Sequence, residues 1–390
     1  MLSVTSSLPD FRKFVHFLIL GAVASAIPCL AGAGSDKPGT TTKPAIEVAR
    51  RIQPTYQISA GLDGEIYPVF ANYVSLRKVQ QRSWGTIAVK VVNSTPETIH
   101  NRISVQIPGW SDQEIQIAEL GAGESHTYLF APTFLRRLYL NREIVAATAA
   151  VGITDASGTV IHRETLPIRL RSVDDLYWGR DFEYAPFIAS WVTPHDSSVE
   201  RILSSAKEFM PGRRLPGYES SNPIIQERST FQQARAIYRA LQEKGVSYVK
   251  SSMTLGGHED VSERVRMPAE SLNQGSANCI DGAVVYAALF ENLGMEPVIV
   301  LVPGHAYVGV RVAAKSNRYL YIETSLTGRT SFDAAVASAS RTMAKLTPSQ
   351  FIRVDIRQSR LDGIYPMPAD DIDARNPVLD ASRRNGTPGS

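Results

Sequence analysis

The chain has 390 residues, of which 43% are hydrophobic and 20% charged, and its formal net charge is +3. This length and apolar content suit a globular protein with enough chain for two domains, each with its own core. The small net charge, without a basic stripe interleaved with aromatic residues, argues against a nucleic-acid-binding protein.

Residues 1–33 are predicted to form an export signal. Arg12 and Lys13 precede an apolar segment, residues 14–24, and small residues follow it. Cleavage after Ala33 would place the mature protein in the periplasm or outside the cell. The alternative is an uncleaved membrane anchor, because the apolar segment and its flank are almost long enough to span a bilayer. No second apolar segment of that length follows, so we expect no stable membrane span after cleavage.

Cleavage at this point would leave a single cysteine. Cys29 lies within the signal, so the mature chain keeps only Cys279. A lone thiol in an exported protein cannot form an internal disulfide and is open to oxidation, which marks it as a candidate reactive group. The alternative is that Cys279 is a small buried apolar residue.

Two segments follow the signal before the helical part of the chain. Residues 34–55 are polar and contain glycine and proline, which predicts a linker. Residues 56–172 alternate apolar and polar side chains in short runs, such as 87–92 and 103–107, that turn residues separate. This pattern predicts an all-β, immunoglobulin-like sandwich with a packing, spacing or binding role.

Residues 173–366 mix helical and strand-like segments and are predicted to form a second, α+β domain. Ser197 to Glu200 is interpreted as a capping box before one helix, and Thr230 to Gln233 as the start of another that Gly245 ends. A further helix is expected over 332–344 and a strand over 350–356.

Two polar segments carry no strong pattern. His258, Glu259 and Asp260 lie in a polar loop and are a weak metal-site candidate, because adjacent side chains diverge on regular elements. Residues 367–390 contain scarcely any apolar pattern and are predicted to be a disordered tail.

The stretch from Met267 to Thr324 holds the candidate chemistry. Cys279 lies where a polar loop meets the apolar, helix-like run 280–293, so with Asn278 as N-cap it would occupy the first helical turn. A thiol is a useful nucleophile only as the thiolate, and a helix N-terminus favours that anion. Strand-like runs over 297–302, 306–313 and 319–324 follow.

A histidine and a glutamate at the boundaries of these strands complete the set. If the sheet folds back over the helix start, His305 can take the thiol proton and Glu323 can orient the imidazole. The Cys279 backbone N–H is one candidate oxyanion donor, and the Gln274 side chain is a second. Asp281 is interpreted as a helix N-terminal acid outside catalysis. Taken singly, His305 can instead be a polar residue at a strand end and Glu323 a surface carboxylate.

These motifs resemble the transglutaminase-like superfamily of papain-fold cysteine enzymes, in its bacterial exported form. The resemblance covers 267–324 and is carried by the segments Met267-Pro268-Ala269-Glu270, Cys279-Ile280-Asp281, Ala287-Ala288-Leu289, Pro303-Gly304-His305-Ala306 and Tyr321-Ile322-Glu323-Thr324. It implies Cys279 as nucleophile, His305 as base and Glu323 as third member. The superfamily usually has aspartate at that third position. Animal transglutaminases have an aromatic residue where this chain has Ile280, which speaks against protein crosslinking.

The sequence therefore predicts a periplasmic or secreted cysteine-dependent hydrolase or acyltransferase. It would act on a protein or peptide substrate through an acyl-enzyme, without a cofactor. Two alternatives stay open: an inert papain-fold scaffold that acts through its β-sandwich, and a structural metal site built from Cys279, His305 and a carboxylate. The substrate, the acceptor and the oligomeric state do not follow from the sequence.

Overall fold

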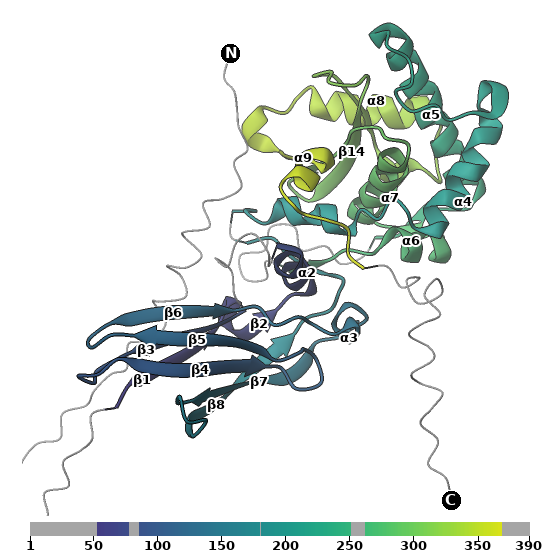
Figure 1. The fold of residues 1–390 in the computed structure, drawn as a ribbon. Helices are drawn as coiled ribbons and strands as arrows, with labels where there is room; N and C mark the ends of the chain where they lie inside the picture. Colours follow the sequence, from purple (N-terminus) through teal and green to yellow (C-terminus); the bar gives the residue numbers. More distant parts are fainter. Residues whose placement is uncertain (1–52, 78–85, 180, 251–261, 369–390) are drawn as a thin grey trace, which may run out of the picture. The chain divides into compact units, whose positions relative to one another are not determined.

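The computed structural model describes residues 53–77, 86–179, 181–250 and 262–368 (Figure 1). The predicted signal, almost all of the linker, the His258–Asp260 group and nearly all of the predicted tail lie outside these residues. The chain has a mixed α+β structure with several sheets, as the sequence predicts at this coarse level. It divides into two compact units, which are described separately.

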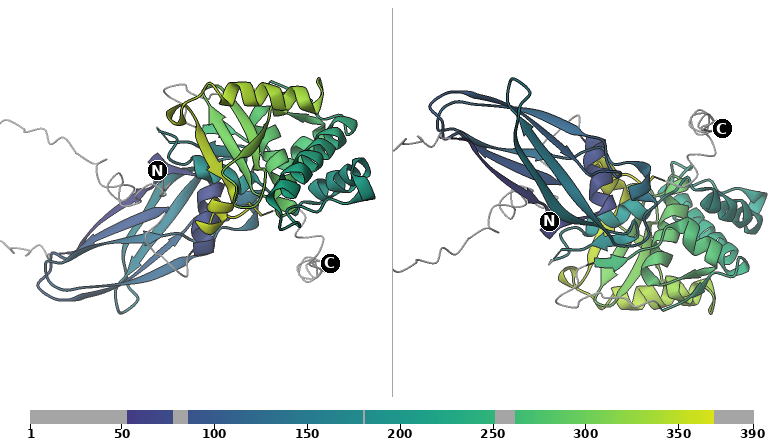
Figure 2. Two further views of the ribbon diagram at one scale, coloured as in Figure 1. Left: turned by 90° about the horizontal axis from the view of Figure 1, so that it is seen from above. Right: turned by 90° about the horizontal axis from the view of Figure 1, so that it is seen from below.

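The first unit contains a three-stranded and a five-stranded sheet, whose strands run side by side in Figure 2. The sheet orders are β1-β3-β6 and β2-β8-β7-β4-β5. The strands are β1 (Thr55–Ala60), β2 (Glu65–Ile66), β3 (Ile87–Val92), β4 (Ile99–Gln106), β5 (Glu114–Leu120), β6 (Ser125–Phe130), β7 (Val145–Thr154) and β8 (Val160–Leu170), and a short η1 (Leu62–Gly64) lies between β1 and β2. β3 pairs antiparallel with β1 and β6, and β4 with β5 and β7.

Period-two alternation explains which side chains of these strands are buried. On β4, Ile103 and Val105 are fully buried, whereas Ile117 on β5 is 63% exposed. Gln116 of β5 donates from Nε2 to the carbonyl of Leu129 in β6 at 2.7 Å, which joins strands of the two sheets. The predicted strands over 87–92 and 103–107 are therefore present.

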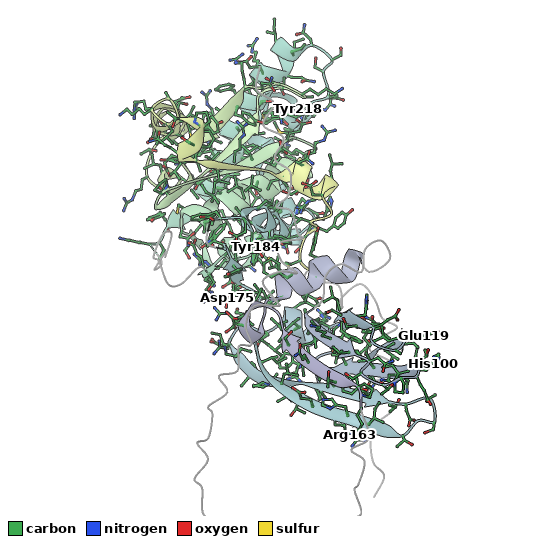
Figure 3. The ribbon with its side chains drawn as sticks, turned by 90° about the vertical axis from the view of Figure 1, so that its left-hand side faces the viewer. His100, Glu119, Arg163, Asp175, Tyr184 and Tyr218 are labelled. Carbon is green, nitrogen blue, oxygen red and sulfur yellow. The ribbon has the colours of Figure 1, made fainter. Side chains whose placement is uncertain are left out.

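Two helices interrupt residues 56–172, the segment for which the sequence predicts an all-β structure. α2 (Pro68–Arg77) belongs to the second unit, as does the short α3 (Arg136–Tyr139). Phe70 of α2 packs edge-on against Phe187, with ring centroids 4.9 Å apart. Its ring centroid is 5.1 Å from that of Tyr184, a residue that Figure 3 labels. The first turns of α2 are buried on every side, so the helix leaves no amphipathic period in the sequence.

The rest of the second unit begins with a short strand and a set of helices. These are β9 (Asp175–Tyr177), η2 (Ala185–Trp191), α4 (Ser197–Ala206), η3 (Lys207–Phe209), η4 (Pro211–Arg213), α5 (Pro223–Glu243), β10 (Ser247–Tyr248), β11 (Ser262–Arg264), α6 (Pro268–Gln274), β12 (Ser276–Ala277) and α7 (Cys279–Asn292). β9 pairs antiparallel with β11, and β10 pairs parallel with β12.

Both predicted capping boxes were wrong. The N-cap of α4 is Asp196, whose carboxylate accepts from the Ser198 N–H. The N-cap of α5 is Asn222, and Pro223 stands in its first turn, so the helix begins two turns before Thr230. The Thr230 hydroxyl donates instead to the carbonyl of Val312 at 3.0 Å, inside the core.

An antiparallel sheet of order β15-β14-β13-β16 completes the unit. The remaining elements are β13 (Pro297–Val302), β14 (His305–Arg311), β15 (Tyr319–Ile322), η5 (Thr324–Leu326), α8 (Phe332–Met343), η6 (Pro348–Gln350), β16 (Ile352–Asp355) and α9 (Ile356–Leu361). α7 packs on β14 and β13, and α8 packs on β15. These bounds confirm the strands and the helix predicted here to within about two residues.

No helix among the described residues is long and apolar enough to cross a membrane.

Candidate functional site

Cys279 is the first residue of α7, as predicted. The Asn278 side chain accepts from the Asp281 N–H at 2.8 Å, and the Asp281 carboxylate accepts in return from the Asn278 N–H at 3.3 Å. This reciprocal cap fixes the first turn of α7, and the helix dipole favours an anion there. Cys279 itself is fully buried.

His305 begins β14, directly after the tight turn from β13. Gly304 has φ +73, a left-handed conformation that suits glycine, and the turn pairs His305 with Val302. The ring of Tyr307 meets the His305 ring edge-on, with centroids 4.7 Å apart and an interplanar angle of 83°. The His305 side chain is 26% exposed, so the site opens to solvent at the imidazole.

Glu323 follows β15 and caps η5. Both of its carboxylate oxygens approach His305 Nε2, at 3.0 and 2.8 Å. Oε1 also accepts from the Ser325 N–H at 3.1 Å and from the Ser325 hydroxyl at 2.7 Å. The carboxylate is almost fully buried, so its orientation is set by these partners.

A side-chain hydrogen bond also joins His305 to Cys279. The structure thus brings the three predicted residues together in the order thiol, imidazole, carboxylate. Burial by itself would lower the pKa of His305, but the hydrogen bonds and charges of Cys279 and Glu323 outweigh it and raise that pKa to about 9. Burial works to raise the pKa of Glu323, yet bonds to His305 and Ser325 leave it lowered. A pKa raised in this direction favours the charged imidazolium at neutral pH.

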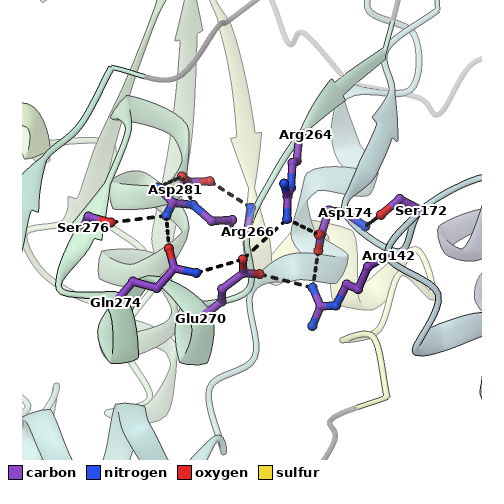
Figure 4. A network of polar contacts seen from close by, with 9 residues as sticks. All are labelled: Arg142, Ser172, Asp174, Arg264, Arg266, Glu270, Gln274, Ser276 and Asp281. Carbon is purple, nitrogen blue, oxygen red and sulfur yellow. Dashed lines mark hydrogen bonds and ion pairs between the residues drawn. The ribbon is translucent and has the colours of Figure 1, made fainter. Parts of the chain in front are cut away.

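Gln274, the candidate oxyanion donor, is the last residue of α6. Its Nε2 donates to Glu270 at 3.2 Å, and its Oε1 accepts from Arg266 at 2.7 Å (Figure 4). The side chain is thus held in a polar network, and a role toward an oxyanion stays a prediction.

Tyr248 is a neighbour of the site that the sequence did not point to. Parallel pairing of β10 with β12 sets Tyr248 opposite Ala277, two residues before Cys279, and Val249 N–H donates to the Ala277 carbonyl at 3.0 Å. Burial, together with the charges of Cys279 and Glu323, raises the Tyr248 pKa. Only a long-range pairing places this ring at the site, so no local signal could have identified it.

Within the described residues, no group of three or more His, Cys, Asp and Glu side chains is placed to hold a metal ion. The sequence matches no model of a known protein family and no curated protein.

Proposed function

We propose that the chain is an exported thiol enzyme that attacks amide or peptide carbonyls, with Cys279 as nucleophile and His305 and Glu323 as its partners. In the same proposal the first unit is an immunoglobulin-like sandwich and the second a papain-fold, transglutaminase-like domain. The observation that supports it most is the hydrogen-bonded order of Cys279, His305 and Glu323 at the start of α7. An imidazole charged at neutral pH fits a thiolate–imidazolium pair.

The chemistry proceeds by two acyl transfers. The thiolate sulfur adds to the carbonyl carbon, and the electron pair of the carbonyl moves to oxygen. When the tetrahedral intermediate collapses, the C–N bond breaks and the His305 imidazolium gives its proton to the departing amine, which leaves a thioester. Neutral His305 then takes a proton from water as the water attacks the thioester, and the acid is released with the thiol site restored.

The Cys279 backbone N–H is the oxyanion donor in this proposal, because it belongs to the first turn of α7, where the helix dipole favours a negative charge. Glu323 holds the imidazole through Nε2, which leaves Nδ1 for the thiol. Hydrolysis is the favoured outcome over amine transfer, since water needs no second binding site.

The second candidate function is a scaffold with an inert site, which the complete burial of Cys279 favours. Alkylation separates the two. The full chain is treated with iodoacetamide at about pH 6 to 7, and modification of Cys279 is followed by mass spectrometry. An activated thiol labels at least about tenfold faster than a model thiol, and His305→Ala removes the difference.

His162→Ala is the matched control, because His162 also pairs with a carboxylate, Glu164 at 3.2 Å, but lies on β8. It should leave labelling unchanged. Labelling no faster than a model thiol, together with no effect of His305→Ala, would support the scaffold. If Cys279 is activated, the substrate is identified from the library peptides that the wild type hydrolyses and Cys279→Ala does not.

A further inference from the structure

A buried carboxylate shares the first turn of α7 with the proposed nucleophile. Asp281 is two residues after Cys279 in the first turn of α7, and its side chain is 1% exposed. It is needed there, because it caps the Asn278 N–H. A carboxylate charge in the same helical turn as a thiol disfavours the thiolate, as any like charge does. The helix start therefore combines a cap that holds Cys279 in place with a charge that works against its reactivity.

Arg266 meets this carboxylate from the segment before α6 (Figure 4). Its backbone N–H donates to Asp281 Oδ1 at 2.8 Å and its Nε to Oδ2 at 2.8 Å. Nη2 is also 2.8 Å from Oδ2. The arginine is itself largely buried, with 14% of its side chain exposed, so its charge acts on Asp281 with little screening by solvent.

The guanidinium is held in this pose from its other side. Nη1 donates to Gln274 Oε1 at 2.7 Å and to the Ser276 hydroxyl at 3.4 Å. Gln274 in turn donates to Glu270. Arg264, two residues earlier, takes a different direction and pairs with Asp174 at 3.1 Å and Glu270 at 3.6 Å.

We propose that Arg266 is a positioning residue for Cys279. It cancels the charge of Asp281, so that Asp281 can hold the first turn of α7 while the helix start still favours a thiolate. This rests on the proposed thiol-enzyme function, to which it adds a residue that acts on the nucleophile through Asp281. Glu263 is a second buried carboxyl, whose ionisation the charge of Asp281 opposes.

The test measures the pH midpoint of Cys279 alkylation in the full chain. Arg266→Met should raise the midpoint by about one unit, which is about tenfold less thiolate below the midpoint. Arg266→Lys keeps the charge and should shift it less. Asp281→Asn should move the midpoint in the opposite direction, and Arg266→Met/Asp281→Asn should return it to the wild-type value.

Arg264→Met is the control, because it removes an arginine from the same network without touching Asp281. It should leave the midpoint unchanged. Equal shifts in the two arginine variants, or a double variant that keeps the shift, would overturn the role of Arg266. If Arg266→Met fails to fold, Asp281→Asn and the double variant decide the question. The alkylation midpoint of Asp281→Asn must then lie below that of the wild type, and the midpoint of the double variant must equal it.

Failure of the thiol-enzyme proposal would look different. In that case the wild-type midpoint would match a model thiol and His305→Ala would not change it. The role of Arg266 is read from the differences among the Arg266, Arg264 and Asp281 variants, whatever the wild-type value is.

Discussion

The two carboxylate oxygens of Glu323 lie against a single nitrogen of His305, Nε2, at 3.0 and 2.8 Å. Nε2 must therefore carry a proton and donate it to the carboxylate. Ser325 binds Oε1 through both its backbone N–H and its hydroxyl, which prevents the carboxylate from turning away. The imidazole is thereby fixed in the tautomer that leaves Nδ1 for Cys279.

Replacing this carboxylate should impair turnover while leaving the fold intact. Glu323→Gln keeps the shape but removes the charge, so we expect turnover to fall by about 100-fold and the His305 pKa to drop from about 9 toward 6.5. The side chain in Glu323→Asp is one methylene shorter, so it should lose much of the contact with His305 Nε2. NMR titration of His305 and peptide hydrolysis measure the two effects. Ser325→Ala, which removes one of several bonds to Glu323, should produce a smaller loss.

Turnover and alkylation should respond differently to alkaline pH. The folded pKa of His305 is raised to about 9, so the imidazolium persists at neutral pH and is lost as pH rises through about 9. Peptide hydrolysis needs that proton for the departing amine and should decline there, whereas alkylation needs only the thiolate and should stay high. A parallel decline of the two rates above pH 9 would contradict this division of roles.

The raised pKa of His305 also makes the unfolding free energy depend on pH. A histidine whose folded pKa exceeds its unfolded value adds stability that is fully present below about 6.5 and is lost as pH rises through about 9. Glu323, with its pKa lowered, adds stability above its ordinary value that is lost as pH falls through the folded pKa. Measured by urea unfolding, the unfolding free energy of His305→Ala should therefore fall less than that of the wild type as pH rises from about 6.5 to about 9.

Glu263 should destabilise the protein at neutral and alkaline pH. It is 5% exposed, and burial raises the pKa of its carboxyl to about 7, although a side-chain hydrogen bond with Trp178 acts in the lowering direction. The folded state holds this proton more tightly than the unfolded chain. The contribution of Glu263 to the unfolding free energy is therefore highest below about pH 4.5. It falls by on the order of 3 kcal/mol in total as pH rises through about 7.

Glu263→Gln tests this directly. The variant should be more stable than wild type at pH 8 and should lose the fall in unfolding free energy between pH 5 and 8. The exposed Glu219, at 62% side-chain exposure, provides the control, and Glu219→Gln should follow the wild-type curve. A wild-type unfolding free energy that does not change over this range would contradict the expectation.

The strands and helix around the site follow from the sequence because their signals are local. Asn278 and Asp281 cap each other three residues apart, and the glycine after Pro303 sets the turn before His305. The first two turns of α5 were missed for an equally local reason. Ile224 and Ile225 are 78% and 55% exposed there, so no buried stripe marks the helix before Thr230.

The contacts that give the site its character depend on residues distant in sequence. Arg266 reaches Asp281 across 15 residues, and Tyr248 reaches the neighbourhood of Cys279 through pairing with Ala277. Whether Glu323 meets His305 depends on the register of the β14–β15 hairpin, in which Val308 pairs with Ile322. A slip of one residue in this pairing would turn the Glu323 carboxylate to the other face of the sheet. The alternation of side chains over residues 319–324 does not by itself exclude such a slip.

Gly282→Ala should move Cys279 away from His305 and Glu323 without unfolding the protein. A Cβ at Gly282 would lie 2.8 Å from Thr324 Oγ1 and 3.0 Å from Thr324 Cβ, well inside van der Waals contact. The Thr324 hydroxyl donates to the carbonyl of Cys279 at 3.3 Å, so this is where α7 meets the segment that carries Glu323. Pushing the two apart should cost about 1–3 kcal/mol of unfolding free energy and lower the His305 pKa, since its bond to Cys279 is weakened.

Ala283→Gly separates the effect on the site from the loss of stability. It removes a buried methyl group and weakens the same helix, by a similar amount, but leaves the close approach of Gly282 to Thr324 intact. We therefore expect the His305 titration to stay near pH 9 in Ala283→Gly and to shift toward 6.5 in Gly282→Ala at equal unfolding free energy. Thr324→Ala removes the closest atom, and in combination with Gly282→Ala it should recover part of the shift. A His305 pKa that follows overall stability in all three variants would mean that the contact between α7 and Thr324 has no special part in holding the thiol, the imidazole and the carboxylate together.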